Sequence, residues 1–487
     1  MARTPPASSY DLAVLGLILA LALALRVIGL DAPLWFDEIL TMETHVSLPW
    51  SDFVNSYSMN HHYLHNLEVK LATEALGEAN WVVRLPAMIF GVGAIAAAWF
   101  LARPIGGPNA AHLTALLLAV SYHHIWFSQN ARGYTELAFW GTVGMSLFLH
   151  AVKAPRPRLW IGYGIVLAAA TYTHLTGAFL FAAQGLLLLA MLLWQAVRGR
   201  AGGADFLWPV VGYGLGLALS ALLYLPVLPG LLETVTAVSE TSAVDVMHEY
   251  QTPLWSIAEA LRTGLGAAGP VTVLAGLMLS ALLLLGAAAS RRPAPLFAPA
   301  VGLHVALSVL LLVGLGMRVW PRFFFVDSAF FVLLAVLGVQ SLCRWVGQKL
   351  PGGGTWVMPV TAAVLVAAST ALALRNYLGP KQDLAGAVRL VAAERLPGER
   401  VFTFGPGGQI FNGYFGTDWT MLAPSDDYAA AMATGPALMV VVFPGRVFRA
   451  FPAFSAEEES GRLSQLGAFK GTLGDGTVLV YRRHADG

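Results

Sequence analysis

Apolar runs recur along residues 1–376, and short polar segments separate them. Each run has about 20 residues, which is enough for a helix to cross a hydrocarbon core about 30 Å thick. The pattern predicts an α-helical polytopic membrane protein with about eleven transmembrane helices. We place these at residues 11–30, 82–102, 109–127, 133–152, 158–174, 176–197, 206–228, 267–289, 295–316, 323–343 and 356–375.

The pattern changes in residues 377–487. The segment "DLAGAVRLVAAERLPGERVFTFGPGG" indicates an amphipathic helix, a Pro-Gly turn and a strand. Two later segments, "PALMVVVFPG" and "GTVLVYRR", read as a buried strand and a candidate edge strand. We therefore predict a membrane domain over residues 1–376 and a small soluble α/β domain over residues 377–487.

The composition agrees with a membrane location. The chain is 57% hydrophobic and only 12% charged, whereas charged residues make up about 25% of a typical soluble domain. A net charge of +1 with no basic tract does not indicate a nucleic-acid partner. Cys343 is the one cysteine, which excludes an intramolecular disulfide and a cysteine metal cluster. The first apolar run lacks a signal-peptide cleavage site and is predicted to be retained.

Charges in the connecting loops alternate between two sides. One set of short loops is basic and poor in acids, and the positive-inside rule places these loops in the cytoplasm. They contain Arg103, Lys153, Arg156, Arg158, Arg198, Arg200, Arg291, Arg292, Arg344 and Lys349. The other loops, including residues 31–81 and 229–266, then face the exterior or periplasm. The N-terminus is predicted to be cytoplasmic and the C-terminal domain periplasmic or extracellular.

The first exterior loop carries two adjacent acids, Asp37 and Glu38, directly after the first span in "LWFDEILT". Acids in such a loop are usually solvated surface groups. The apolar "PLWF" segment, however, should hold Asp37 against the membrane, where ionisable groups are costly and tend to serve a function. Asp37 is therefore a candidate functional residue.

Arginines mark two other exterior turns. Arg132 lies between Gln129 and Tyr134 in "SYHHIWFSQNARGYTEL", and Arg318 and Arg322 lie in "RVWPRFFFVDSAFF". An interfacial arginine can also simply anchor a helix end. Several cations on the same side as a carboxylate favour an anionic lipid headgroup, because arginine offers planar, bidentate donors to phosphate. The pattern indicates a phosphate-bearing lipid substrate whose reacting end meets an acid at the outer leaflet.

These motifs resemble those of the GT-C superfamily, the membrane glycosyltransferases that use polyprenyl-phosphate sugars. The resemblance is strongest to the bacterial branch related to protein O-mannosyltransferases and the lipid A aminoarabinose transferase. It covers roughly residues 10–345 and rests on four segments. These are "LWFDEILT", "NHHYLHNLEVKLATEALGEANWVVRLPAMIFGV", "SYHHIWFSQNARGYTEL" and "WPRFFFVDSAFF".

The resemblance implies an inverting transferase in which Asp37 is the catalytic base and Glu38 extends the motif. It assigns Arg132 and Arg322 to the lipid phosphate, with Gln129 and Tyr134 as supports. The "NHHYLHNL" segment departs from the family, since relatives carry two prolines there. His61, His62, His65, Lys70 and Arg318 are further candidates for the phosphate or sugar. A divalent metal held by Asp37, Glu38, His61 and His62 is an alternative, since these ligand types suit zinc or manganese.

The sequence therefore predicts a glycosyltransferase of the bacterial inner membrane with a periplasmic active site and no nucleic-acid partner. Its donor would be a polyprenyl-phosphate sugar, such as an undecaprenyl-phosphate sugar, and its acceptor a hydroxyl of a glycolipid, polysaccharide or protein. Three rival functions share some of these features. A lipid-linked sugar flippase would need a polar path through the spans, where charges are few. A metal-dependent phospholipid-modifying hydrolase would use the same acids with a metal, and an O-antigen polymerase or ligase would also use a polyprenyl donor but is not supported by the "DE" and "QNARGY" segments.

Overall fold

A computed structural model describes residues 6–154, 156–200, 202–240, 248–405, 407–423, 427–432, 435–474 and 476–484. The chain divides into two compact units. The first contains Met1–Leu30, Trp50–Ala243 and Glu249–Leu374, and the second contains Asp31–Pro49, Val244–His248 and Arg375–Gly487. The part of the predicted exterior loop 229–266 at residues 241–247 lies outside the described residues.

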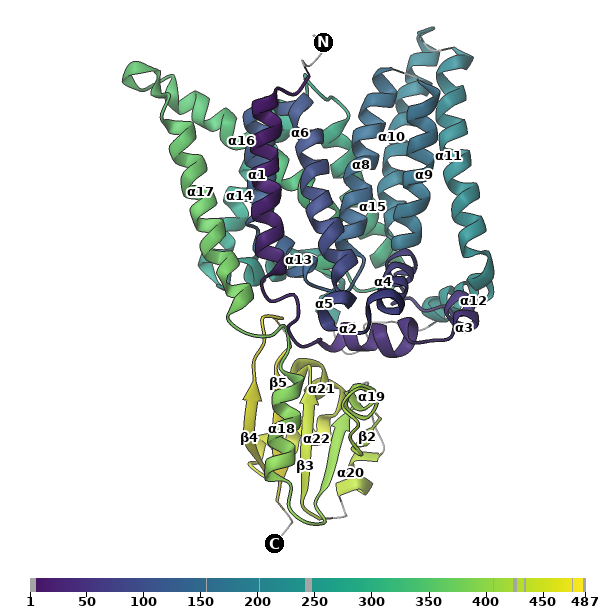
Figure 1. Cartoon of the computed structure of the whole chain (residues 1–487), viewed down its shortest axis with the longest axis vertical. Coiled ribbons are helices and arrows are strands. Elements are labelled where there is room, and N and C mark those ends of the chain that lie inside the picture. Colours follow the sequence, from purple (N-terminus) through teal and green to yellow (C-terminus); the bar gives the residue numbers. More distant parts are fainter. Residues whose placement is uncertain are drawn as a thin grey trace. The chain divides into compact units, whose positions relative to one another are not determined.

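The first unit is a bundle of long helices that run roughly parallel to one another (Figure 1). Large side chains such as Trp99, Phe148, Phe181 and Phe330 fill its core. The long helices are α1 (Ser9–Val27), α6 (Leu85–Ala119), α8 (Tyr134–Lys153), α9 (Pro157–Thr173), α10 (Gly177–Val197), α11 (Gly203–Tyr224), α14 (Pro270–Ser290), α15 (Phe297–Gly314), α16 (Ser328–Gly347) and α17 (Val357–Ala373).

Shorter helices gather at one end of this bundle (Figure 1). They come from segments that the sequence analysis placed in exterior loops or at their edges. These helices are α3 (Trp50–Asn55), α4 (Tyr63–Leu76), α5 (Asn80–Val83), α12 (Leu228–Glu240) and α13 (Pro253–Leu265). Two further short elements, α7 (Tyr122–Ser128) and the 3-10 helix η4 (Pro321–Asp327), each precede a long helix, α8 and α16 respectively.

The chain is a multi-pass membrane protein. Its described residues contain eight helices that are long and apolar enough to cross a membrane. One of them, α6, covers two predicted spans. It is interrupted at Gly107, which has a non-helical φ of 82° and is followed by Pro108. The predicted spans at 133–152 and 158–174 correspond to the more polar α8 and the 17-residue α9, which are outside the eight. The count of eleven spans stays a prediction.

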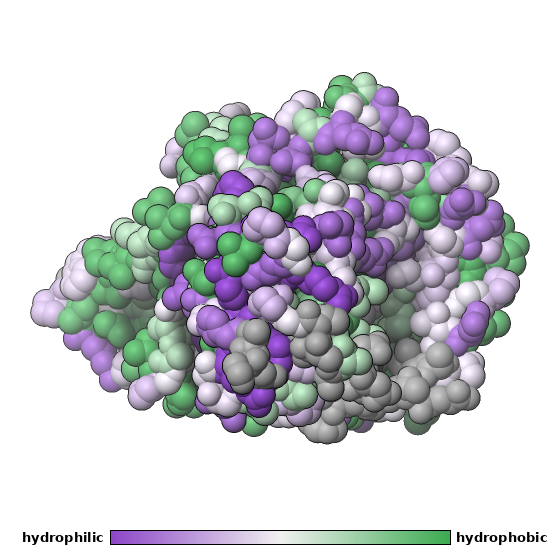
Figure 2. All heavy atoms as spheres, turned by 90° about the horizontal axis from the view of Figure 1, so that it is seen from below, coloured by the Kyte–Doolittle hydropathy of each residue, from purple (hydrophilic) through white to green (hydrophobic). Residues whose placement is uncertain are grey.

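Exposed leucine and valine side chains on α11, α14 and α17 are suited to contact with lipid, and include Leu217, Leu277, Leu284 and Val364. By contrast, hydrophilic residues cover much of the face drawn in Figure 2, and hydrophobic residues show mainly around its margins.

Helices α14 and α16 approach each other closely through glycines. A Cβ added at Gly338 would collide with the backbone carbonyl of Leu282, and one added at Gly286 would collide with that of Leu334. Because the obstacle is backbone rather than a flexible side chain, the helices themselves would have to separate. Small residues at such contacts are typical of helix association in membranes.

We expect Gly338→Ala to lower the free energy of unfolding by about 1–3 kcal/mol, as overpacking usually does. The thermal unfolding midpoint of the detergent-solubilised protein would measure this loss. Gly302→Ala in α15 is the matched control, since no atom lies within 4 Å of the added Cβ there. Equal midpoints for the two variants would contradict the close-packing interpretation.

The second unit contains a five-stranded mixed sheet, which confirms the predicted small α/β domain. The strands are β1 (Arg400–Phe404), β2 (Thr420–Leu422), β3 (Ala437–Val442), β4 (Leu463–Phe469) and β5 (Val478–Arg483), in the order β2-β1-β3-β5-β4. Strand β1 is parallel to β2 and β3, whereas β5 is antiparallel to β3 and β4. Helices α18 (Leu384–Glu394), α19 (Gly407–Gly413), α20 (Asp427–Met432), α21 (Pro444–Ala450) and α22 (Pro452–Glu459) complete the unit.

The candidate edge strand "GTVLVYRR" was predicted wrongly. It forms β5, which pairs with β3 on one side and β4 on the other. The edge strand on this side of the sheet is β4. Most residues of its sequence, "LSQLGAF", are exposed or half-buried, and its pairing shifts register between Gln465 and Gly467. Such a strand lacks the regular apolar alternation that marks strands in sequence.

Residues 31–49 belong to the same compact unit as the C-terminal domain. Phe36 begins α2 (Phe36–Thr41), and its ring packs edge-on against Phe443 with 5.1 Å between centroids. Its backbone N–H donates to Gln382 Oε1 at 3.3 Å. The buried aromatic contact explains why a segment directly after the first span packs with residues more than 300 positions later.

Candidate functional site

The turn between α7 and α8 is tied to the segment that precedes α4. The side chain of Arg132 is only 2% exposed, and its guanidinium donates to Asn60 Oδ1. The backbone N–H of Gly133 donates to Nδ1 of His62 at 3.1 Å. These contacts fix the Arg132 guanidinium beside the segment that precedes α4, although the two segments are about 70 positions apart.

Histidine rings connect this turn to η4. The ring of His62 lies 4.7 Å from that of His174 and 4.9 Å from that of Tyr134. His174 in turn contacts Phe323, the neighbour of Arg322, with 5.7 Å between ring centroids. The structure thus brings together four residues predicted for the donor phosphate: Arg132, His62, Tyr134 and Arg322.

The electrostatics of this cluster favour an anion. Burial lowers the pKa of His62 well below its ordinary value, and the positive charges of Arg132 and Arg322 lower it further. His62 is therefore a neutral imidazole at pH 7, whereas both arginines remain charged. Two fixed guanidinium groups around neutral ring donors are suited to a phosphate, because an anion would offset their mutual repulsion.

The other predicted residues of the first unit lie in different surroundings. The His61 ring stacks on the Tyr63 ring with 3.9 Å between centroids, and His61 Nδ1 lies 3.1 Å from Asn66 Nδ2. Lys70 lies over the Trp50 ring and pairs with Glu74, and Arg318 lies over the rings of Tyr250 and Trp320. Gln129 donates from Nε2 to the backbone carbonyls of Arg26 and Ile28, which holds the end of α1.

The two predicted acids lie in the second unit. Asp37 and Glu38 occupy the first turn of α2, and Asp37 is partly exposed. Glu38 is fully buried, and its Oε2 accepts a hydrogen bond from the backbone N–H of Trp35 at 3.2 Å. A glutamate at this position closes the first turn of a helix. The contact gives Glu38 a role in positioning α2 and hence Asp37.

A buried pair fixes η4, which carries Arg322. His304 on α15 and Asp327 at the end of η4 are at most 1% exposed, and His304 Nδ1 lies 2.9 Å from Asp327 Oδ1. We expect Asp327→Ala to cost about 1–3 kcal/mol of stability, because it leaves the histidine nitrogen buried without its acceptor. Asp327→Asn keeps an acceptor and should retain most of the thermal unfolding midpoint. Equal losses in both variants would show that the pair's hydrogen bond is not what stabilises η4.

One buried group was not predicted as a set, although His65 alone was a candidate for the phosphate or sugar. His65 and Glu68 on α4 and Glu136 on α8 place ligand-type atoms within 4.8 Å of one another. Two sequence signals pointed to them: the His-x-x-Glu spacing puts His65 and Glu68 on one helix face, and Glu136 is an acid at a span start. The metal alternative predicted from sequence had named Asp37, Glu38, His61 and His62 instead.

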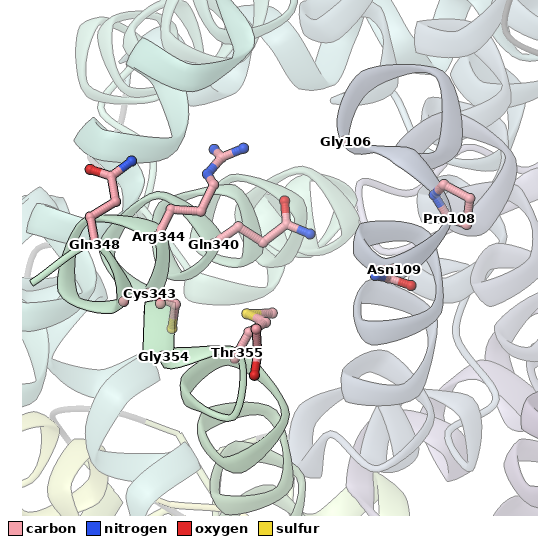
Figure 3. Close-up of a pocket in the computed structure, with 12 residues that line it drawn as sticks. Gly106, Pro108, Asn109, Gln340, Cys343, Arg344, Gln348, Gly354 and Thr355 are labelled. Carbon is pink, nitrogen blue, oxygen red and sulfur yellow. The ribbon is translucent and has the colours of Figure 1, made fainter. Parts of the chain in front are cut away.

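The pocket drawn in Figure 3 is separate from these residues. It is an open cavity of about 570 Å³ between α6 and α16, lined by Asn109, Gln340, Arg344 and Gln348 among others. The pocket lies at the C-terminal end of the 20-residue α16, whereas η4 directly precedes its N-terminal end. At 1.5 Å per residue the two ends of α16 are about 30 Å apart.

Comparison with known proteins extends the sequence resemblance to the whole fold. Residues 60–228 match the family model described as dolichyl-phosphate-mannose-protein mannosyltransferase. Among solved structures, ArnT from Cupriavidus metallidurans bound to undecaprenyl phosphate is 15% identical, with a TM-score of 0.52 over 98% of both chains. The Archaeoglobus fulgidus oligosaccharyltransferase in complex with Zn and sulfate is 16% identical, with a TM-score of 0.54 over 88% of this chain and 68% of its own.

The chain has the GT-C fold. The archaeal oligosaccharyltransferase AglB from Archaeoglobus fulgidus, in complex with an inhibitory peptide and a dolichol-phosphate, gives a TM-score of 0.52 at 13% identity, over 89% and 69% of the two chains. No curated protein matches the sequence. The predicted resemblance to GT-C membrane glycosyltransferases related to O-mannosyltransferases and ArnT is confirmed. The segment that matches the family model contains both His62 and Arg132.

Proposed function

We propose that the chain is an inverting glycosyltransferase that moves a sugar from a polyprenyl-phosphate donor to a hydroxyl acceptor. The observation that carries this proposal is the arrangement of Arg132 and Arg322 around the neutral His62. The cluster belongs to a helical unit with the GT-C fold and favours an anion. A lipid phosphate is an anion that the membrane itself supplies, and one structural neighbour holds undecaprenyl phosphate.

In this reaction the acceptor oxygen attacks the anomeric carbon from the face opposite the phosphate. The bond between the anomeric carbon and the phosphate oxygen breaks, and the polyprenyl phosphate leaves with the bonding electron pair. Asp37 takes the proton from the acceptor hydroxyl, and Glu38 holds α2 so that Asp37 is presented at the helix start. Arg132 and Arg322 stabilise the charge that grows on the leaving phosphate.

The remaining candidates receive supporting roles. Gln129 fixes the end of α1, from which the chain continues toward Asp37. Tyr134 packs against His62 and so orients that ring. We propose that His61, Lys70 and Arg318, which lie against the aromatic rings of Tyr63, Trp50 and Tyr250, shape the surroundings of the donor.

We place the reaction at the outer face of the bacterial inner membrane. The basic loops support a cytoplasmic N-terminus and a periplasmic C-terminal domain. The donor already carries an activated anomeric phosphate, so a nucleotide sugar is not needed at that face. The acceptor would approach from the aqueous side, with the loop 229–266 and the domain 377–487 as its guides.

Mass spectrometry of lipid extracts and envelope glycans from cells with and without the protein tests the proposal. We expect one lipid-linked sugar to accumulate in the deletion strain and one glycan to disappear. Purified protein in detergent is then given that lipid and the glycan-deficient acceptor fraction. Formation of the missing glycan supports a transferase. A flippase would form no product in detergent, and a hydrolase would release free sugar without an acceptor.

A further inference from the structure

We propose that His65, Glu68 and Glu136 form a binding site for one divalent transition-metal ion, with zinc as the best match, that clamps α4 to α8. The three side chains offer ligand atoms within 4.8 Å of one another. Imidazole nitrogen and carboxylate oxygen are both zinc ligands, and three protein ligands leave a fourth position open to water. This inference does not depend on the proposed transfer reaction.

Four polar atoms of the cluster lack a hydrogen-bond partner. Both ring nitrogens of His65, Oε2 of Glu68 and Oε2 of Glu136 are buried and make no hydrogen bond. His65 Nδ1 and Glu136 Oε2 lie 3.5 Å apart, and both side chains have no exposed area. Buried polar atoms without a partner are rare and cost about 1–3 kcal/mol each. An ion at their centre would satisfy all three side chains together.

Glu136 is oriented by its surroundings as a metal ligand would be. Its Oε1 accepts hydrogen bonds from Thr173 Oγ1 at 2.9 Å and from Trp140 Nε1 at 3.1 Å. These two donors fix the carboxylate and leave Oε2 directed at His65. Outer partners of this kind set the orientation of first-shell ligands in metal sites.

The charges in the cluster also favour a cation. Two buried carboxylates side by side are costly unless a proton or a metal ion neutralises them. A bound dication would supply that neutralising charge and accept an electron pair from the His65 imidazole.

Metal binding here would rigidify the phosphate cluster next to it. His65 lies one turn beyond His62 on α4, and its Cβ adjoins Gly133, the residue after Arg132. Coordination of the ion by ligands from both α4 and α8 would therefore keep these two helices together. The segments that position the Arg132 guanidinium directly precede these helices. We describe the three ligands as positioning residues, since none of them is required to touch the donor.

Metal analysis of the purified full-length protein tests this site. The protein is stripped with EDTA, titrated with Zn²⁺ or Mn²⁺, and its bound metal is measured by inductively coupled plasma mass spectrometry. We expect about one tightly bound Zn²⁺ per chain, a rise in the thermal unfolding midpoint on binding, and weaker binding of Mn²⁺. His65→Ala and Glu68→Gln should each lose the bound zinc and the rise in midpoint.

Glu74→Gln is the matched control, because Glu74 is on the same helix with its side chain 48% exposed. It should bind zinc as the wild type does. A wild-type protein that takes up no zinc, or zinc retained in both His65→Ala and Glu68→Gln, would overturn the site. In that case the two glutamates share a proton instead. Because no sugar donor enters this experiment, its failure would leave the proposed transferase activity untouched.

Discussion

Asp37→Asn should lower the rate of sugar transfer by about 10²–10⁴-fold, the usual contribution of a general base. The amide keeps the size of the carboxylate but cannot take the proton from the acceptor hydroxyl. Since Asp37 is partly exposed in the first turn of α2, the change should leave the thermal unfolding midpoint close to that of the wild type. The loss should appear in kcat, with little change in the KM for the lipid donor.

The control for this variant is Glu43→Gln, which makes the same chemical change at an exposed acid of the same segment. It should transfer sugar at the wild-type rate. In cells, the Asp37→Asn strain should accumulate the same lipid-linked sugar as the deletion strain. Normal glycans in that strain would remove Asp37 as the base and favour the flippase interpretation.

The long helices and the soluble domain could be predicted because their signals are local. Each predicted span falls on a helix of the bundle, and the apolar run at 437–442 became the fully buried strand β3. Strands β2 and β4 were missed, because three residues in one case and mixed burial in the other leave no periodicity to detect.

The candidate site could be predicted only in part, because its geometry depends on contacts between distant segments. Motifs identified Arg132 and Arg322, but only the fold shows that His62 contacts His174 and lies within reach of both arginine charges. Lys70 has the charge of a phosphate ligand, yet its ammonium group lies over the Trp50 ring and forms an ion pair with Glu74. Glu136 was overlooked because its importance lies in its neighbours, Thr173 and His65, which come from other segments.

Arg132→Ala should reduce the rate of transfer by about 10²–10³-fold, equivalent to about 2.7–4 kcal/mol of transition-state stabilisation. The guanidinium is buried and fixed by Asn60, so it would act on the leaving phosphate without reorganising during the reaction. Water in the space left by the side chain cannot supply a positive charge. We therefore expect a fall in kcat together with a higher KM for the lipid donor, since the phosphate is present in both the bound donor and the transition state.

Two further variants separate charge from geometry at this position. Arg132→Lys keeps the charge but loses the planar fork, and should recover only part of the lost rate. Asn60→Ala keeps the guanidinium but removes its acceptor, so it should cause a smaller loss than Arg132→Ala with no change in charge. Rate measurements on all three, with unfolding midpoints as a check on folding, test the assignment. If Arg132→Ala folds and transfers sugar at the wild-type rate, Arg132 does not bind the phosphate, and the role passes to Arg322 alone.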